Sequence, residues 1–138
     1  MNIVFMGTPD FSLPTLQQLY KSNHNIQLVV TQPDRPKGRG RESSPSPVKQ
    51  FALAKGLPVL QTEKLVNPKN VQTLSDLNAD IFVVVAFGQL LKENLLTLPR
   101  HFCMNLHSSI LPKYRGAAPI NWAIIKGEKE TGVTTMKM

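Results

Sequence analysis

Hydrophobic residues along the chain form short continuous runs separated by longer amphipathic stretches. The runs at residues 1–6, 26–30, 80–87 and 102–107, with shorter ones at 58–60 and 133–138, predict β-strands. Apolar residues recur at helical spacing between residues 11 and 20, and the pattern predicts further helices over 48–55, 68–77, 92–96 and 117–125. Because strands and helices alternate, we expect a Rossmann-like α/β fold, with a largely parallel sheet and helices on both faces.

Composition narrows the class of protein. A chain of 138 residues, 41% hydrophobic and 18% charged, is typical of one soluble globular domain. Cys103 is the single cysteine and lies in a predicted strand, so we expect a buried, inert thiol and no internal disulfide. The three histidines lack metal-ligand spacing, so no metal site is expected. No run has the length of a membrane span and the N-terminus lacks the basic start of a signal peptide, which predicts a cytoplasmic location without membrane contact.

Several strand ends carry the residues that a ligand would meet. In open parallel sheets, ligands bind beyond the carboxyl ends of the strands. Gly7, residues 86–89 and His107 all fall at the carboxyl ends of predicted strands, so we expect them to face one crevice. The segment after Gly7 lacks the second and third glycines of a dinucleotide-binding loop. Gly7 is therefore predicted to be a turn glycine that lets the backbone approach a neighbour.

Asn105 and His107 are the strongest candidates for chemistry. Residues two apart in a strand point to the same side, roughly 6.5 Å from each other. The Asn105 amide offers N–H donors for a developing oxyanion, and an imidazole titrates near neutral pH. The pair suits acyl or formyl transfer from a carbonyl to an amine. An isolated Asn-x-His is more often an ordinary polar strand end, so the surrounding sequence has to decide.

A long loop is predicted over residues 31–47. Its basic side chains are Arg35, Lys37, Arg39 and Arg41. A solvated surface loop and a loop that contacts phosphates both fit this pattern, although loops of this length in compact domains are often functional. The net charge of +7 favours a polyanionic partner without establishing one.

The sequence Asn-Leu-His-Ser-Ser-Ile-Leu-Pro-Lys-Tyr-Arg-Gly-Ala-Ala-Pro-Ile at residues 105–120 closely resembles the signature of the formyltetrahydrofolate-dependent formyltransferases. Residues 6–11, 83–88 and 130–138 resemble other motifs of this family, so the resemblance covers nearly the whole chain. Residues 31–40 and 46–49 look like the loop of its tRNA-acting branch. The resemblance implies formyl transfer from 10-formyltetrahydrofolate to the α-amine of methionine on initiator methionyl-tRNA.

The resemblance also implies roles for individual residues. Asn105 would donate to the carbonyl oxygen, and His107 would protonate or polarise that centre. Backbone groups of two segments would bind the folate: Ala86, Phe87, Gly88 and Gln89, and Ser109, Ile110, Leu111 and Pro112. Four side chains would contact the tRNA, Arg39 aligning with a tRNA-contacting arginine of the family: Arg35, Lys37, Arg39 and Arg41. Lys113, Tyr114 and Arg115 are expected at the rim, without catalytic chemistry.

In the family, a catalytic aspartate follows the strand that ends here at Met138. We therefore expect residues 1–138 to be an N-terminal catalytic domain incomplete at its C-terminal end, without the family's C-terminal tRNA-binding domain. By itself it should be weakly active or inactive. Val133, Met136 and Met138 should be partly exposed. Two alternatives stay open: a formyltransferase acting on a sugar nucleotide or other small amine, against which the basic loop argues, and a non-catalytic folate- or RNA-binding fragment. No obligate protein partner is expected.

Overall fold

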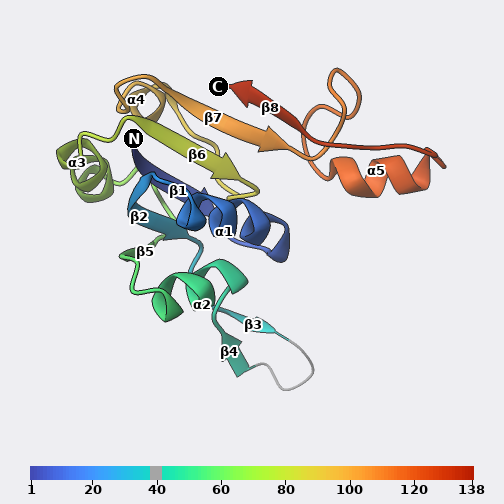
Figure 1. The fold of residues 1–138 in the computed structure, drawn as a ribbon. Helices are drawn as coiled ribbons and strands as arrows, with labels where there is room; N and C mark the ends of the chain where they lie inside the picture. Colours follow the sequence, from blue (N-terminus) through green and yellow to red (C-terminus); the bar gives the residue numbers. More distant parts are fainter. Residues whose placement is uncertain (38–41) are drawn as a thin grey trace.

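The computed structural model describes residues 1–37 and 42–138 and is built on a six-stranded sheet (Figure 1). Five strands are parallel, in the order β5 (Val59–Gln61), β2 (Asn25–Thr31), β1 (Asn2–Gly7), β6 (Ile81–Val85) and β7 (Phe102–His107). The edge strand β8 (Thr134–Lys137) runs antiparallel to β7. The prediction of a largely parallel α/β sheet is confirmed.

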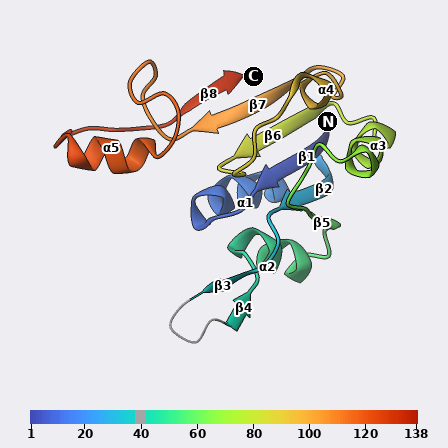
Figure 2. The same ribbon diagram turned by 180° about the vertical axis from the view of Figure 1, so that it is seen from behind.

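Helices cover both faces of the sheet, as predicted, and the two opposite views in Figures 1 and 2 show the layers. A 3-10 turn (Asp10–Ser12), α1 (Leu13–Lys21) and α2 (Pro47–Ala54) pack on one face. On the other face lie α3 (Pro68–Asp76) and α4 (Glu93–Leu96). Every residue of β6 is buried, which explains its continuous apolar sequence. No helix among the described residues is long and apolar enough to cross a membrane.

The predicted loop over residues 31–47 is the main error in the expected elements. Two short strands, β3 (Arg35–Lys37) and β4 (Glu42–Ser44), pair antiparallel there as a separate ribbon beside α2 (Figure 1). Neither strand has the alternating apolar pattern of a half-buried strand, and Pro36 cannot donate to a ladder. Because of these two features, the sequence did not predict the ribbon. Arg39 and Arg41 lie outside the described residues.

The C-terminal part of the chain exposes several apolar side chains. Helix α5 (Pro119–Ile125) lies away from the sheet in Figure 1, and Trp122 and Ile124 on it are 48% and 74% exposed. The expected partial exposure of Val133, Met136 and Met138 is confirmed. The end of the sheet near β8 is therefore more open than the end near α1 and α2.

Gly7 ends β1 where the chain turns toward α1. A Cβ atom at this position would lie 2.8 Å from Ser12 Cβ and 2.9 Å from Phe5 Cε1, inside van der Waals contact. Phe5 and Ser12 are both fully buried, so neither side chain can move aside freely. The expectation that Gly7 permits a close backbone approach is confirmed.

We predict that Gly7→Ala lowers the free energy of unfolding by roughly 1–3 kcal/mol, because this site is overpacked by a methyl group. Chemical denaturation of the purified variant measures the change. Gly132→Ala is a matched control, since its Cβ would meet only the side chain of Ile110, which is half exposed and can give way. Equal losses in the two variants would contradict the steric argument.

Candidate active site

A cleft of about 610 Å³ opens at the carboxyl ends of β6 and β7. Asn105 and His107 both line it, as the strand geometry predicted. Asn105 pairs in register with Val84, whose side chain belongs to the face covered by α3 and α4, so both side chains lie on that side of the sheet. The turn after β6 completes this wall of the cleft with residues Ala86, Phe87, Gly88 and Gln89.

The turn after β6 is held tightly by its neighbours. Ala86 and Gly88 both have left-handed backbones, with φ values of +46° and +86°. Between them, the Phe87 carbonyl accepts hydrogen bonds from Thr8 Oγ1 at 3.2 Å and from Gln32 Nε2 at 3.3 Å. Left-handed non-glycine residues such as Ala86 persist only where the surroundings impose them, and they concentrate at functional sites. The ends of β1 and β2 thus fix the shape of the cleft wall.

Asn105 is half-buried in the lining of the cleft. Its side chain makes no hydrogen bond to any other residue within 1–37 and 42–138. An amide on a strand held in register between β6 and β8 has its position fixed by the sheet. Its N–H groups therefore remain available to a carbonyl oxygen that enters the cleft.

His107 lies at the end of β7, and its ring has one defined partner. Nε2 and the backbone oxygen of Tyr114 are 2.9 Å apart. Because a carbonyl oxygen can only accept, Nε2 must carry a proton and donate it in this bond. In the neutral ring, the lone pair is then on Nδ1, which leaves that atom as the nitrogen able to exchange a proton.

The structure separates the two segments predicted to bind folate. Ala86, Phe87, Gly88 and Gln89 line the cleft together with Asn105 and His107, whereas residues 109–112 form the turn that follows β7 and are not part of that lining. Ser109 is buried and donates from Oγ to the Lys113 carbonyl at 2.6 Å. Ile110 faces a different cavity of about 560 Å³, which it shares with Tyr114 and Glu128.

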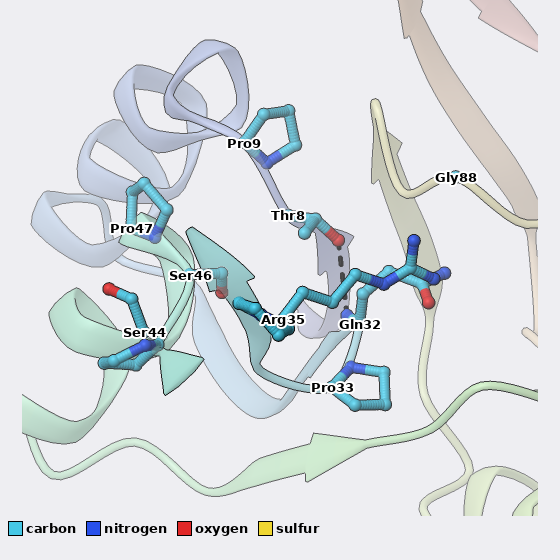
Figure 3. A pocket seen from close by; sticks show the side chains of 11 residues that line it. Thr8, Pro9, Gln32, Pro33, Arg35, Ser44, Ser46, Pro47 and Gly88 are labelled. Carbon is cyan, nitrogen blue, oxygen red and sulfur yellow. Dashed lines mark hydrogen bonds between the residues drawn. The ribbon is translucent and has the colours of Figure 1, made fainter. Parts of the chain in front are cut away.

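A smaller cavity of about 330 Å³ lies between the segment that follows β1 and the β3–β4 ribbon (Figure 3). Its apolar lining consists of five proline rings: Pro9, Pro33, Pro36, Pro45 and Pro47. Figure 3 shows the Arg35 side chain reaching across the cavity past Thr8 toward Gly88. Gly88 also lines the cleft that holds Asn105 and His107, so the two cavities adjoin at this residue.

The base of the ribbon is fixed by an ion pair. Lys49 Nζ on α2 donates to Asp34 Oδ2 at 2.6 Å, and Gln61 Nε2 donates to Asp34 Oδ1 at 2.7 Å. These hydrogen bonds, with Lys49 the larger cause, lower the pKa of Asp34 below its usual value. The carboxylate therefore stays charged at neutral pH, and its bonds tie the residue before Arg35 to α2 and β5. Lys37 belongs to β3 in the same ribbon.

Cys103 is a buried thiol, as predicted. The thiol is buried, and burial raises its pKa to about 11, so it is protonated at neutral pH. Among the described residues, no group of three or more His, Cys, Asp or Glu side chains is placed to hold a metal ion. The polar side chains that line the cleft are those of Asn105, His107, Gln89 and Ser108.

These features define a Rossmann-like α/β protein whose ligand cleft lies at the carboxyl ends of parallel strands, with an amide and an imidazole side by side. The family model described as formyl transferase matches residues 1–138, the whole chain. The chain therefore belongs to the formyl transferase family.

Curated relatives narrow the comparison. The chain is 56% identical over 138 residues to a methionyl-tRNA formyltransferase of Geobacter metallireducens, and 57% identical over 139 residues to one of Caldanaerobacter subterraneus. Both matches cover 100% of this chain but only 44% and 45% of the respective relatives. The chain thus spans less than half the length of the curated relatives that it matches.

Solved structures support the fold. A phosphoribosylglycinamide formyltransferase of Bacillus halodurans superposes with a TM-score of 0.75 at 21% identity, covering 100% of this chain and 72% of that protein. A sugar N-formyltransferase of a Shewanella species gives a TM-score of 0.63 at 16% identity, covering 100% of this chain and 51% of that protein. At these identities the similarity concerns the fold alone.

The sequence did not predict the residues outside the motif at 105–120 that hold the site in place. Thr8 and Gln32 hold the turn after β6, and Thr134 on β8 accepts from Leu111 N at 3.1 Å while donating to the Ser109 carbonyl at 2.7 Å. The position of a polar residue directly after a strand was the only signal in the sequence for Thr8 and Gln32. Their partners are 79 and 55 residues away along the chain, and only the folded sheet reveals them.

Proposed function

We propose that the protein containing this chain transfers the formyl group of 10-formyltetrahydrofolate to the α-amine of methionine on initiator methionyl-tRNA. The observation that carries the proposal is the joint placement of Asn105, His107 and the turn after β6 in one cleft. The relatives named methionyl-tRNA formyltransferase support the choice of acceptor. Because that acceptor is a tRNA of translation, the same proposal assigns the protein to the cytoplasm.

The chemistry follows from the groups in the cleft. The amine attacks the formyl carbon, and a tetrahedral centre with a negatively charged oxygen forms. Asn105 donates an N–H to this oxygen, which stabilises charge that exists only near the transition state. The attacking nitrogen loses a proton, the bond from the formyl carbon to N10 breaks, and N10 takes up a proton. His107 lines the cleft and can accept or donate a proton through Nδ1.

The cleft fits a folate-sized donor. Its volume of about 610 Å³ is within the ~300–1,000 Å³ that is typical of small-molecule sites. In the proposal, backbone groups of Ala86, Phe87, Gly88 and Gln89 bind the pteridine ring. Residues Ser109, Ile110, Leu111 and Pro112 support it from the adjoining turn rather than from the cleft lining.

The proline-lined cavity and the ribbon are the proposed approach of the tRNA. Arg35 lines this cavity, and the cavity and the cleft share Gly88 in their walls. We therefore propose that an acceptor end passing Arg35 brings its amine toward Asn105. Lys37, Arg39 and Arg41 are proposed to contact the same tRNA. The net charge of +7 fits a polyanionic acceptor better than a small neutral amine.

We predict that Arg35→Ala raises the KM for methionyl-tRNA several-fold and leaves the KM for the formyl donor unchanged. If Arg35 contacts one phosphate, the slope of log(kcat/KM) for tRNA against log[salt] should fall by about 1. Steady-state kinetics at several salt concentrations measure both effects. Lys69→Ala on the opposite face, at α3, is the matched control. An effect confined to the KM for the formyl donor would contradict the assignment of Arg35 to tRNA binding.

The experiment that tests the proposal compares acceptors. The purified protein is incubated with 10-formyltetrahydrofolate and either methionyl initiator tRNA or an amino-sugar nucleotide, and formylation is followed by mass spectrometry of the acceptor. We expect turnover of the tRNA and negligible turnover of the sugar nucleotide. The reverse preference would favour the sugar-nucleotide alternative, and turnover of neither would favour a non-catalytic binding role.

A further inference from the structure

We propose that Glu128, acting through Tyr114, is a positioning residue that holds the His107 imidazole in the tautomer with its proton on Nε2. The catalytic consequence rests on the proposed function above, whereas the placement of the ring can be tested without it. Neither Tyr114 nor Glu128 lines the cleft. Both line the separate cavity of about 560 Å³ behind the loop that follows β7.

The contact between His107 and Tyr114 is the first step. The Tyr114 carbonyl is the acceptor for His107 Nε2–H at 2.9 Å, and it therefore determines which ring nitrogen keeps the lone pair. A shift or rotation of this one peptide group would release the ring. The tautomer of His107 therefore depends on the position of the Tyr114 backbone.

The Tyr114 backbone is in a conformation that a tyrosine does not adopt readily. Its φ angle is +53°, in the left-handed region that favours glycine. Such a residue reverts to another conformation unless its surroundings hold it. The neighbouring sequence offers Gly116, also left-handed, as a flexible position through which the loop could relax.

Glu128 supplies the restraint from a different part of the chain. Tyr114 Oη donates to Glu128 Oε1 at 2.7 Å, and Lys113 Nζ lies 3.3 Å from both oxygens of the same carboxylate. One carboxylate therefore holds two consecutive side chains of the loop. The hydrogen bond from Tyr114 is the largest cause that lowers the pKa of Glu128, so the acceptor stays ionised at neutral pH.

The beginning of the loop is fixed independently by β8. Thr134 Oγ1 bridges the Ser109 carbonyl and the Leu111 N–H, and Ser109 Oγ donates to the Lys113 carbonyl. These bonds fix residues 109–113 but stop before Tyr114. Within the described residues, the bond to Glu128 is the only side-chain hydrogen bond of Tyr114. Its loss should free the carbonyl while leaving the rest of the turn in place.

The test combines a direct view of the ring with kinetics on the protein as isolated from its own cells. In Tyr114→Phe the hydroxyl is lost, and in Glu128→Ala the acceptor is lost. Glu128→Gln keeps an acceptor oxygen, and Glu130→Gln is the matched control, an exposed acid in the wall of the same cavity. The ¹⁵N signals of the three histidine rings report the tautomers, and a His107→Gln spectrum assigns those of His107.

We expect wild-type protein, Glu128→Gln and Glu130→Gln to show His107 with its proton on Nε2 in the neutral ring, and Tyr114→Phe and Glu128→Ala to show a mixture of tautomers. In the last two variants kcat should fall about tenfold, less than the ~10²-fold that a 1 Å misplacement can cost, with both KM values unchanged. The double variant should lose no more than either single one, because both act through one hydrogen bond.

The inference is overturned if the wild-type ring carries its proton on Nδ1, or if its tautomer is the same in all variants, whatever happens to kcat. A wild-type protein that formylates no acceptor would defeat the proposed function instead. In that case the ¹⁵N spectra alone would still decide whether Glu128 and Tyr114 position His107.

Discussion

Asn105→Ala should lower kcat for formyl transfer by about 10²–10³-fold, the usual effect of removing one oxyanion donor. The side chain is half-buried at the end of β7, lines the cleft, and has no hydrogen-bond partner among the described residues to be left unpaired by the change. Its contribution is therefore expected in the transition state rather than in stability. Steady-state kinetics measure kcat, and circular dichroism checks the fold.

A second substitution separates hydrogen-bond donation from shape. Asn105→Asp keeps the size of the side chain but replaces the N–H donors with acceptors, so it should be at least as inactive as Asn105→Ala. Turnover within a few-fold of wild type in either variant would rule out Asn105 as the oxyanion donor. A parallel fall in thermal stability would indicate a structural role instead.

The second large effect is expected at His107. His107→Ala should lower kcat by about 10²–10⁴-fold, the range usually lost with a general acid or base. The ring is the titratable group that lines the cleft beside Asn105, and its Nδ1 is free to exchange a proton. Substrate KM values should change little, because the ring acts on the reacting centre rather than on binding.

His101→Ala is the matched control for this prediction. His101 is exposed and directly precedes β7, so its loss removes an imidazole near the opposite end of the same strand. Its kcat should equal that of wild type. Equal losses in the two variants would show that the effect comes from the strand and not from the chemistry of His107.

Most of the fold could be predicted because hydrophobic burial determines it. Strand β7 has the predicted bounds, and the continuous run around β6 corresponds to a strand buried on both faces. The β3–β4 ribbon could not be predicted, because its short strands carry a proline and charges, and because the residue before β3 is held to α2 by the Lys49–Asp34 ion pair. That pairing joins residues 15 positions apart and leaves no periodic trace in the sequence.

The part of the site that lies on a single strand could be predicted. Asn105 and His107 share a strand, so their common side follows from alternation alone. The restraint on the His107 ring was not predictable, because the tyrosine that provides it has a left-handed backbone held by a glutamate 14 residues later. The sequence predicted a rim position without chemistry for Tyr114. In the structure Tyr114 lines the separate cavity instead of the cleft and contacts His107 through its carbonyl.

The central claim is that the formyl carbon is held between Asn105 and His107. A formyl donor carrying ¹³C and its proton at the formyl group can be bound to the protein without an amine acceptor, and nuclear Overhauser effects from the formyl proton then identify its neighbours. We expect effects to the side-chain amide of Asn105 and to the ring of His107, with weaker ones to the turn at residues 86–89. Effects to Ile110 and Tyr114 in the separate cavity, with none to Asn105 or His107, would contradict the claim.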